Sequence, residues 1–358
     1  MYMRKSSKQF YMFNIFLTCL IIQHLTQHFL LFHNGSSCSF KFLLRNVTDN
    51  IDHTVKFLQD NKVIARIKQC PGPITSKSHR SGCGSPMLLK STSDRCDGIM
   101  WRCRKIHIFT KNELKYCRKD VKLSIRHNTW LSDAKLPLGI IVELIYLWSQ
   151  GFSNSEIQHE LKISPKTIIE WTCYFREAVT IYMMEISEPI GGNGIEVEID
   201  ESKFGKRKYH KGHRVQGQWV FGGREKYDKS KIFMVPVNNR KQCTLLPIIK
   251  KWIKPGSIIH SDCWKAYNCL TKNGYTHVTV NHSKEFINKE SYACTNSIES
   301  DWRHAKVMMP SYGVHQGAHS NYLGEFMWRR RYHNADKFKV LIDILNDTFA
   351  KKYMTSVP

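Results

Sequence analysis

The clearest pattern along the chain is an alternation of apolar and acidic side chains over residues 194–200. The odd-numbered positions are apolar (Ile195, Val197 and Ile199), and the even-numbered positions from 196 to Asp200 are acidic. A period of two is typical of a half-buried β-strand, because successive side chains of a strand point to opposite faces. The pattern therefore predicts a strand that presents a row of carboxylates.

Apolar runs further along the chain predict the rest of a sheet. The expected order is three strands, a helix, a strand, a helix, a strand and then helices, which is typical of a mixed α/β layered fold. The later strands are expected at 217–223, 231–237, 257–261 and 277–280, and the helices between them at 243–252 and 264–270.

Ahead of the sheet, the sequence predicts two short helices joined by a tight turn. A capping box at residues 153–156 starts the first helix, and Ser164 with Pro165 starts the second. Such a pair is either a helix-turn-helix that enters the major groove or an ordinary helical hairpin that only packs. We prefer the helix-turn-helix, and expect Lys166 and Thr167 to be its exposed contacts.

The amino-terminal part is less regular. Basic residues precede an apolar run at 11–22, which has the charge and length of a signal-peptide head. Polar residues interrupt the run, so it is not a continuous membrane span. It is either a secretory or anchoring segment or a hydrophobic extension outside the fold, and we prefer the extension. Helices are expected at 51–66 and 136–149.

Charge narrows the choice of partner. The 358 residues include 54 Lys and Arg against 30 Asp and Glu, which gives a formal net charge of +24. A charge of this size points to nucleic acid or to an anionic membrane surface. A basic loop follows the first predicted strand, and its candidate DNA contacts are Lys203, Lys206, Arg207 and Lys208.

Three acidic residues are the candidate catalytic groups. Asp200 ends one predicted strand, Asp262 follows another, and Glu299 lies near a predicted helix start. Mg²⁺ and Mn²⁺ prefer carboxylate oxygens, and a metal site in a basic chain suits phosphodiester chemistry. The alternative is that each acid is a solvated surface charge. Glu201 is expected to point to the side of the strand opposite Asp200.

The region from 70 to 117 is a candidate zinc site. The twelve cysteines of the whole chain are scattered and form no dense disulfide framework. Zinc ribbons bind their metal through close pairs of cysteines, and the cysteines of this region are spaced more widely than in such pairs. The alternative to a zinc site is a set of free cysteines in a flexible basic segment. The first ligand set is Cys70, Cys83, Cys103 and Cys117, and a second grouping is His79, Cys83, Cys103 and His107.

These motifs together resemble a known family. The chain is similar to DDE transposases of the Merlin type, which are related to the ISXO-like enzymes of bacterial insertion sequences. The resemblance rests on residues 198–202, 222–223, 260–267, 280–283, 295–302 and 322–329.

The resemblance implies an RNase H-like catalytic domain. It implies that Asp200, Asp262 and Glu299 form the metal-binding triad, holding Mg²⁺ or Mn²⁺. It also implies that Lys306, two helical turns after Glu299, contacts a DNA phosphate, and that the cysteine-bearing region binds zinc.

The expected organisation is an α/β chain of four parts. A hydrophobic extension at 1–50 precedes a cysteine-bearing DNA-contact region at 51–130, a helix-turn-helix region at 131–188 and the catalytic domain at 194–348. The expected function is cleavage and transfer of DNA at terminal inverted repeats. The partners are duplex DNA and further copies of the chain, without a small-molecule cofactor, in a nucleus if the source is eukaryotic. The alternative is a domesticated nuclear DNA-binding protein.

Overall fold

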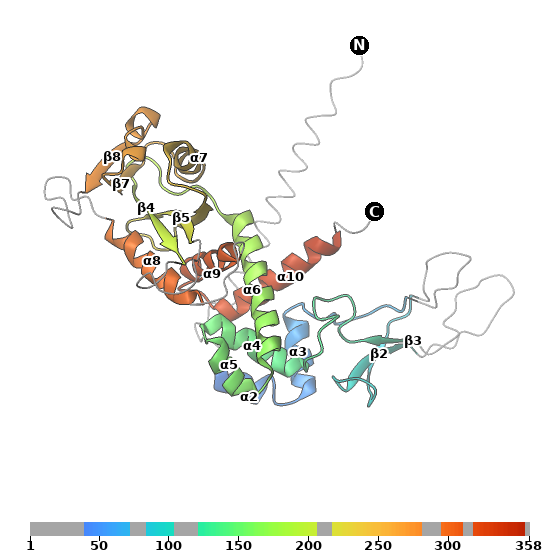
Figure 1. Ribbon diagram of the computed structural model, residues 1–358. Helices are drawn as coiled ribbons and strands as arrows, with labels where there is room; N and C mark the ends of the chain where they lie inside the picture. Colours follow the sequence, from blue (N-terminus) through green and yellow to red (C-terminus); the bar gives the residue numbers. More distant parts are fainter. Residues whose placement is uncertain are drawn as a thin grey trace, which may run out of the picture. The chain divides into compact units, whose positions relative to one another are not determined.

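The computed structural model describes residues 39–71, 84–103, 121–205, 217–280, 295–310 and 318–354 (Figure 1). The chain divides into two compact units, 1–43 and 44–358. The first is described only at 39–43, where helix α2 (Phe40–Asn46) begins. The apolar run at 11–22 therefore lies outside the described residues. No helix within the described ranges has the length and apolar character needed to cross a membrane.

The second unit contains a mixed five-stranded sheet, which confirms the α/β prediction. The strand order is β6-β5-β4-β7-β8, so β4, the first strand of this sheet along the chain, is central. Strand β5 is antiparallel to β4 and β6, whereas β7 and β8 run parallel to β4. The strands are β4 (Glu196–Phe204), β5 (Gln218–Glu225), β6 (Ile232–Val237), β7 (Ile258–Asp262) and β8 (Thr276–Val280).

Strand β4 is buried on both faces, so the prediction of a half-buried strand was wrong. Val197 and Ile199 pack into an apolar cluster with α7 (Gln242–Trp252). The acidic face is covered by α8 (Asn296–Met308), and Glu198 is 0% exposed. The alternation was interpreted correctly as a strand, but it could not show that a later helix would cover the polar side.

The segment after β7 forms two 3₁₀ turns where the sequence predicted one helix at 264–270. They are η1 (Lys265–Tyr267) and η2 (Thr271–Asn273). Side chains three residues apart eclipse each other in a 3₁₀ helix. Tyr267 and Leu270 therefore lie on one side, and both are 0% exposed in the core beside α7.

Helices from both halves of the chain pack together. Helix α6 (Pro165–Ile186) is longer than predicted because α9 (His319–Arg331) and α10 (Lys337–Met354) pack along it. A Cβ at Gly324 would lie only 2.2 Å from Thr180 Oγ1, so glycine lets α9 approach α6 closely. The other helices are α3 (Ile51–Asp60), α4 (Leu138–Gln150) and α5 (Asn154–Leu161).

The connection from α6 to β4 is attached to the sheet. Ile190 pairs with Ile253, donating to Trp252 O at 2.8 Å and accepting from Lys254 N at 2.9 Å. These bonds fix the point at which the chain enters the central strand.

A small antiparallel sheet of three strands was not predicted. It contains β1 (Leu88–Ser91), β2 (Ile99–Cys103) and β3 (Val121–Ser124). Short strands in a Ser- and Gly-rich segment give little periodicity, which explains why they were missed.

Candidate active site

Helix α8 is anchored to the central strand at its first turn. The backbone N–H groups of Ser297 and Ile298 both donate to Glu198 Oε2 at 2.9 Å. The first N–H groups of a helix have no partner within the helix, and Thr295 at the N-cap makes no side-chain cap bond. Glu198 therefore caps α8 from β4.

The contact continues along the same face of β4. Trp302 Nε1 donates to Asp200 Oδ2 at 3.0 Å, and Lys306 Nζ donates to Ser202 Oγ at 2.6 Å. Gly222 pairs with Asp200, and a Cβ there would lie 2.6 Å from the Trp302 ring. The glycine thus makes room for the indole that holds the Asp200 carboxylate.

Asp262 lies at the end of the neighbouring parallel strand. The register pairs Glu198 with His260, and the same offset continued by two residues places Asp262 beside Asp200. Asp262 Oδ1 accepts the Trp264 backbone N–H at 3.0 Å. The two aspartates are therefore brought together as expected. Asp262 ends its strand, whereas the prediction that Asp200 ends one was wrong, because β4 continues to Phe204.

The surroundings of Asp200 disfavour its ionised form. Burial raises the pKa of Asp200 to about 7, and the charges of Glu201 and Asp262 add to this rise. The Trp302 hydrogen bond and a backbone hydrogen bond oppose it. Hard divalent ions bind carboxylates and relieve such repulsion, so the donor chemistry of this pair fits Mg²⁺ or Mn²⁺.

Glu201 is a third acid of the site. It points to the face of β4 opposite Asp200, as predicted, and Tyr267 Oη donates to its Oε1 at 2.5 Å. Burial raises the Glu201 pKa, and the Asp262 charge raises it further. Glu201 is therefore coupled to the aspartate pair. Its position next to Asp200 was the only sequence signal.

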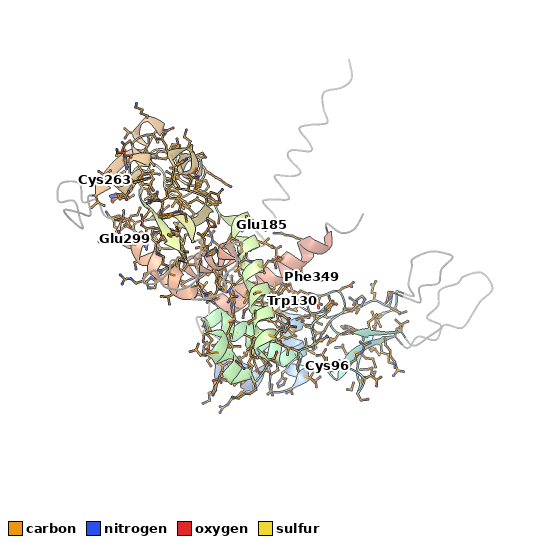
Figure 2. The ribbon with its side chains drawn as sticks, viewed as in Figure 1. Cys96, Trp130, Glu185, Cys263, Glu299 and Phe349 are labelled. Carbon is orange, nitrogen blue, oxygen red and sulfur yellow. The ribbon has the colours of Figure 1, made fainter. Side chains whose placement is uncertain are left out.

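Glu299 lies in the first turn of α8, where Figure 2 labels it. Thr295 Oγ1 donates to Glu299 Oε1 at 3.1 Å, which directs this carboxylate toward its own helix start. Among the described residues, no three His, Cys, Asp or Glu side chains converge closely enough to hold a metal ion. The structure thus unites Asp200 and Asp262 without closing a three-ligand site on Glu299.

The raised Asp200 pKa predicts how stability depends on pH. Because the folded pKa of about 7 exceeds the ordinary 3.8, the folded chain holds this proton over the interval between the two values. Metal-free stability is therefore expected to fall as pH rises through that interval, by a few kcal/mol at most. Urea unfolding in EDTA across this range measures the fall, and Asp200→Asn should flatten it. An unchanged slope in the variant would contradict the assignment.

The structure describes some of the residues that were predicted to contact DNA. The Lys166 side chain is 87% exposed, and the Thr167 backbone N–H donates to Ser164 Oγ at 3.2 Å. The capping box of α5 and the Ser164 cap of α6 are confirmed, whereas DNA reading by these helices stays a prediction. Lys203 is exposed at the end of β4. Outside the described residues lie Lys206, Arg207 and Lys208.

Two cysteines of the first predicted zinc set lie in the described residues. Cys70 and Cys103 are both buried in one cluster with Met87 and Trp101. Residues outside the described ranges complete both proposed sets, so zinc binding stays a prediction. These residues are His79, Cys83, His107 and Cys117.

Comparisons with known proteins define the class. The sequence profile of the ISXO2-like transposase domain matches residues 189–331, which include β4 to β8, α8 and α9. An "uncharacterized transposase-like protein" of Haemophilus influenzae is 35% identical over 118 residues, covering 33% of this chain and 92% of that protein. The chain belongs to the ISXO2-like transposase family.

Two solved structures have weaker likeness. One is a chain of the simian T-cell lymphotropic virus intasome in complex with PP2A regulatory subunit B56 gamma, at 13% identity and a TM-score of 0.26, covering 49% of this chain and 68% of that one. The other is a chain of a pre-cleavage Mos1 transpososome, at 7% identity and a TM-score of 0.18, covering 57% and 78%. At these scores the family assignment rests on the sequence matches.

Proposed function

We propose that the chain is a DNA transposase of the DDE type, with an RNase H-like catalytic domain in which Asp200, Asp262 and Glu299 hold Mg²⁺ or Mn²⁺. The observation that carries this proposal is the half-buried Asp200–Asp262 pair on adjacent parallel strands, within the segment that matches the transposase family. For Glu299 to join the pair, its carboxylate must turn away from Thr295 at the anchored start of α8.

Each residue of the site has a definite task in this proposal. The bound cations supply an activated oxygen and stabilise the leaving oxygen of the phosphodiester. Trp302 fixes the Asp200 carboxylate through its Nε1 hydrogen bond. Glu198 keeps the start of α8 against β4, so Glu299 stays within the same region. Lys306 is placed by the same helix, and we assign it to a DNA phosphate near the cleaved bond.

We assign duplex DNA as the partner, at the terminal inverted repeats and at the target. The net charge of +24 supports this, because neutralising phosphates releases condensed counterions and strengthens binding. Helices α5 and α6 are assigned to reading of the repeats, and the cysteine-bearing region to zinc binding and further DNA contact. Assembly of several copies on DNA and a nuclear location complete the proposal.

A non-cleaving DNA-binding protein is the second candidate. The observation that favours it is the contact of Glu299 with Thr295, which leaves the acid pair without a third ligand among the described residues. The two candidates share DNA binding and differ in chemistry.

The deciding experiment uses the purified full-length chain. A supercoiled plasmid carrying the two ends of the element is incubated with Mg²⁺, with Mn²⁺ or with EDTA. Metal-dependent nicks at the ends support the transposase. Binding to the ends without nicking under any metal supports the second candidate and overturns the proposed chemistry.

The helix-turn-helix assignment predicts a loss of sequence preference. Lys166 is exposed near the start of α6, where a recognition helix contacts base edges. Lys166→Ala is expected to reduce preference for repeat DNA over unrelated duplex by about fivefold or more, as for loss of one specific base contact. Competition binding measures this preference. Lys250→Ala, on an exposed position of α7, is the matched control and should leave it unchanged.

An equal loss on both duplexes would assign Lys166 to a phosphate contact only, because phosphate contacts carry no sequence information.

A further inference from the structure

An arginine is held between two tryptophan rings beside the acid pair. The Arg240 guanidinium carbon lies 4.3 Å from the centroid of the Trp219 ring and 4.7 Å from that of Trp264. Trp264 Nε1 donates to the Arg240 carbonyl at 3.2 Å, which fixes the second ring relative to the arginine backbone. A planar guanidinium stacks well on aromatic faces and can bind an anion through its N–H edges. The Glu201 carboxylate is close enough to Arg240 to interact with its charge.

This Trp219–Arg240–Trp264 stack adjoins the candidate active site. The Trp264 backbone N–H donates to Asp262 Oδ1 at 3.0 Å. Trp219 lies on β5 opposite Lys203 of β4, and the Lys203 ammonium lies 5.6 Å from the Trp219 ring. The stack therefore combines two cations and two indoles next to Asp262. Trp219 and Lys203 lie on the face of the sheet that carries Glu201, opposite the Asp200 side chain, so the stack meets the site at the sheet edge. The cleavage chemistry proposed above uses none of these four side chains.

We propose that the Trp219–Arg240–Trp264 stack binds an unpaired nucleotide next to the scissile phosphate, with its base on Trp264 and its phosphate on Arg240. This inference rests on the proposed function and names a subsite of the same active site. It accounts for how a strand separated from its complement is held while the acids act on it.

The choice of an unpaired nucleotide follows from the exposed indole. Trp264 is 40% exposed, although Arg240 covers part of it. A base inside a duplex has both faces covered by its neighbours, whereas an unpaired base offers a free face for stacking on an aromatic side chain. The adjacent guanidinium selects a polyanion and disfavours a cationic ligand. A single strand of DNA satisfies both conditions.

The test compares single-stranded and duplex DNA in EDTA, so that cleavage does not enter the measurement. The probes are a fluorescent oligothymidine and a duplex of the same length, titrated with the full-length chain. Trp264→Ala is expected to weaken oligothymidine binding by about tenfold, within the range seen when stacking aromatic residues are replaced by alanine. Duplex binding should change by less than about twofold, because its bases cannot reach the ring.

Two conservative variants protect the test against misfolding. Trp264→Phe keeps a stacking ring and should retain most of the oligothymidine affinity. Arg240→Lys keeps the charge but loses the planar stack, and should weaken oligothymidine binding more than duplex binding. The matched control is Tyr227→Ala, because Tyr227 is 81% exposed and lies 5.5 Å from the Lys226 ammonium at the other end of β4.

The proposal is overturned if Trp264→Ala weakens both probes equally, weakens neither, or has no larger effect than Tyr227→Ala. Loss of oligothymidine affinity in both Trp264→Ala and Trp264→Phe would also overturn it, since the ring would then act only through folding. The nicking experiment with Mg²⁺ is independent of these outcomes. If the chain nicks DNA but Trp264→Ala does not weaken oligothymidine binding selectively, the subsite alone is refuted. If Trp264→Ala weakens oligothymidine binding selectively but the chain does not nick DNA, the proposed chemistry alone is refuted.

Discussion

Asp200→Asn is expected to reduce metal-dependent nicking of repeat DNA by about a thousandfold or more, because several kcal/mol of metal-ion stabilisation is lost from the transition state. Asparagine keeps the size of the side chain and its hydrogen bond from Trp302, but removes a charge that a hard cation requires. Asp262→Asn should have a similar effect, and the double variant should be little worse than either, as for groups that act as a unit. Initial rates of nicking measure the loss.

The control for this prediction must be an acid outside the coupled group. Glu201 is unsuitable, because its carboxylate interacts with that of Asp262. Glu196 lies on the same strand and the same face as Asp200, but pairs with Lys226 at 2.6 Å near the opposite end. Glu196→Gln should retain nicking, and all variants should retain DNA binding. Parental rates in both aspartate variants would show that the wrong carboxylates have been chosen.

Asp301→Ala is expected to lower the free energy of unfolding by about 3–5 kcal/mol, the usual cost of breaking a buried ion pair by removing one partner. The Asp301 side chain is 0% exposed, and binds Arg224 at 3.0 Å and Arg330 at 2.5 Å. It thereby joins α8 to β5 and α9. Its loss leaves two guanidinium groups, both largely buried, without their shared carboxylate.

Urea unfolding measures this effect as a lower midpoint at unchanged slope. The matched control is Asp343→Ala, because Asp343 pairs with Lys339 at 2.9 Å while its side chain is 59% exposed. An exposed pair of this kind contributes at most about 1 kcal/mol. Equal losses in Asp301→Ala and Asp343→Ala would contradict the importance assigned to the buried pair.

Elements with strong local signals were predicted well from the sequence. The capping box of α5 and the Ser164–Pro165 start of α6 are local, so their geometry follows from a few neighbouring residues. The length of α6 and the cover over β4 depend on helices more than 90 residues later in the chain. The hydrophobic periodicity of a short stretch of sequence carries no information about contacts with residues so far away in the chain.

In the candidate site, too, some features were predictable from local sequence and others depend on contacts between distant segments. Placing Asp200 and Asp262 on two strands of one sheet was enough to expect them together, although Asp200 lies within β4 and not at its end. The cap that Glu198 provides was not predictable, since an acid on the polar side of a strand is usually solvated. The Trp219–Arg240–Trp264 stack draws on three separate segments without a shared periodicity. Its discovery required the positions of the rings.

The hydrogen bonds from Ser297 and Ile298 to Glu198 have a consequence for how this enzyme family can vary. The start of α8 is fixed by β4, and its position is therefore independent of the length of the segment that precedes it in the chain. Insertions or deletions between β8 and α8 can accumulate while Glu299 and Lys306 keep their places relative to Asp200. Glu198 thus fixes the start of α8 through the sheet and not through the chain that connects β8 to α8.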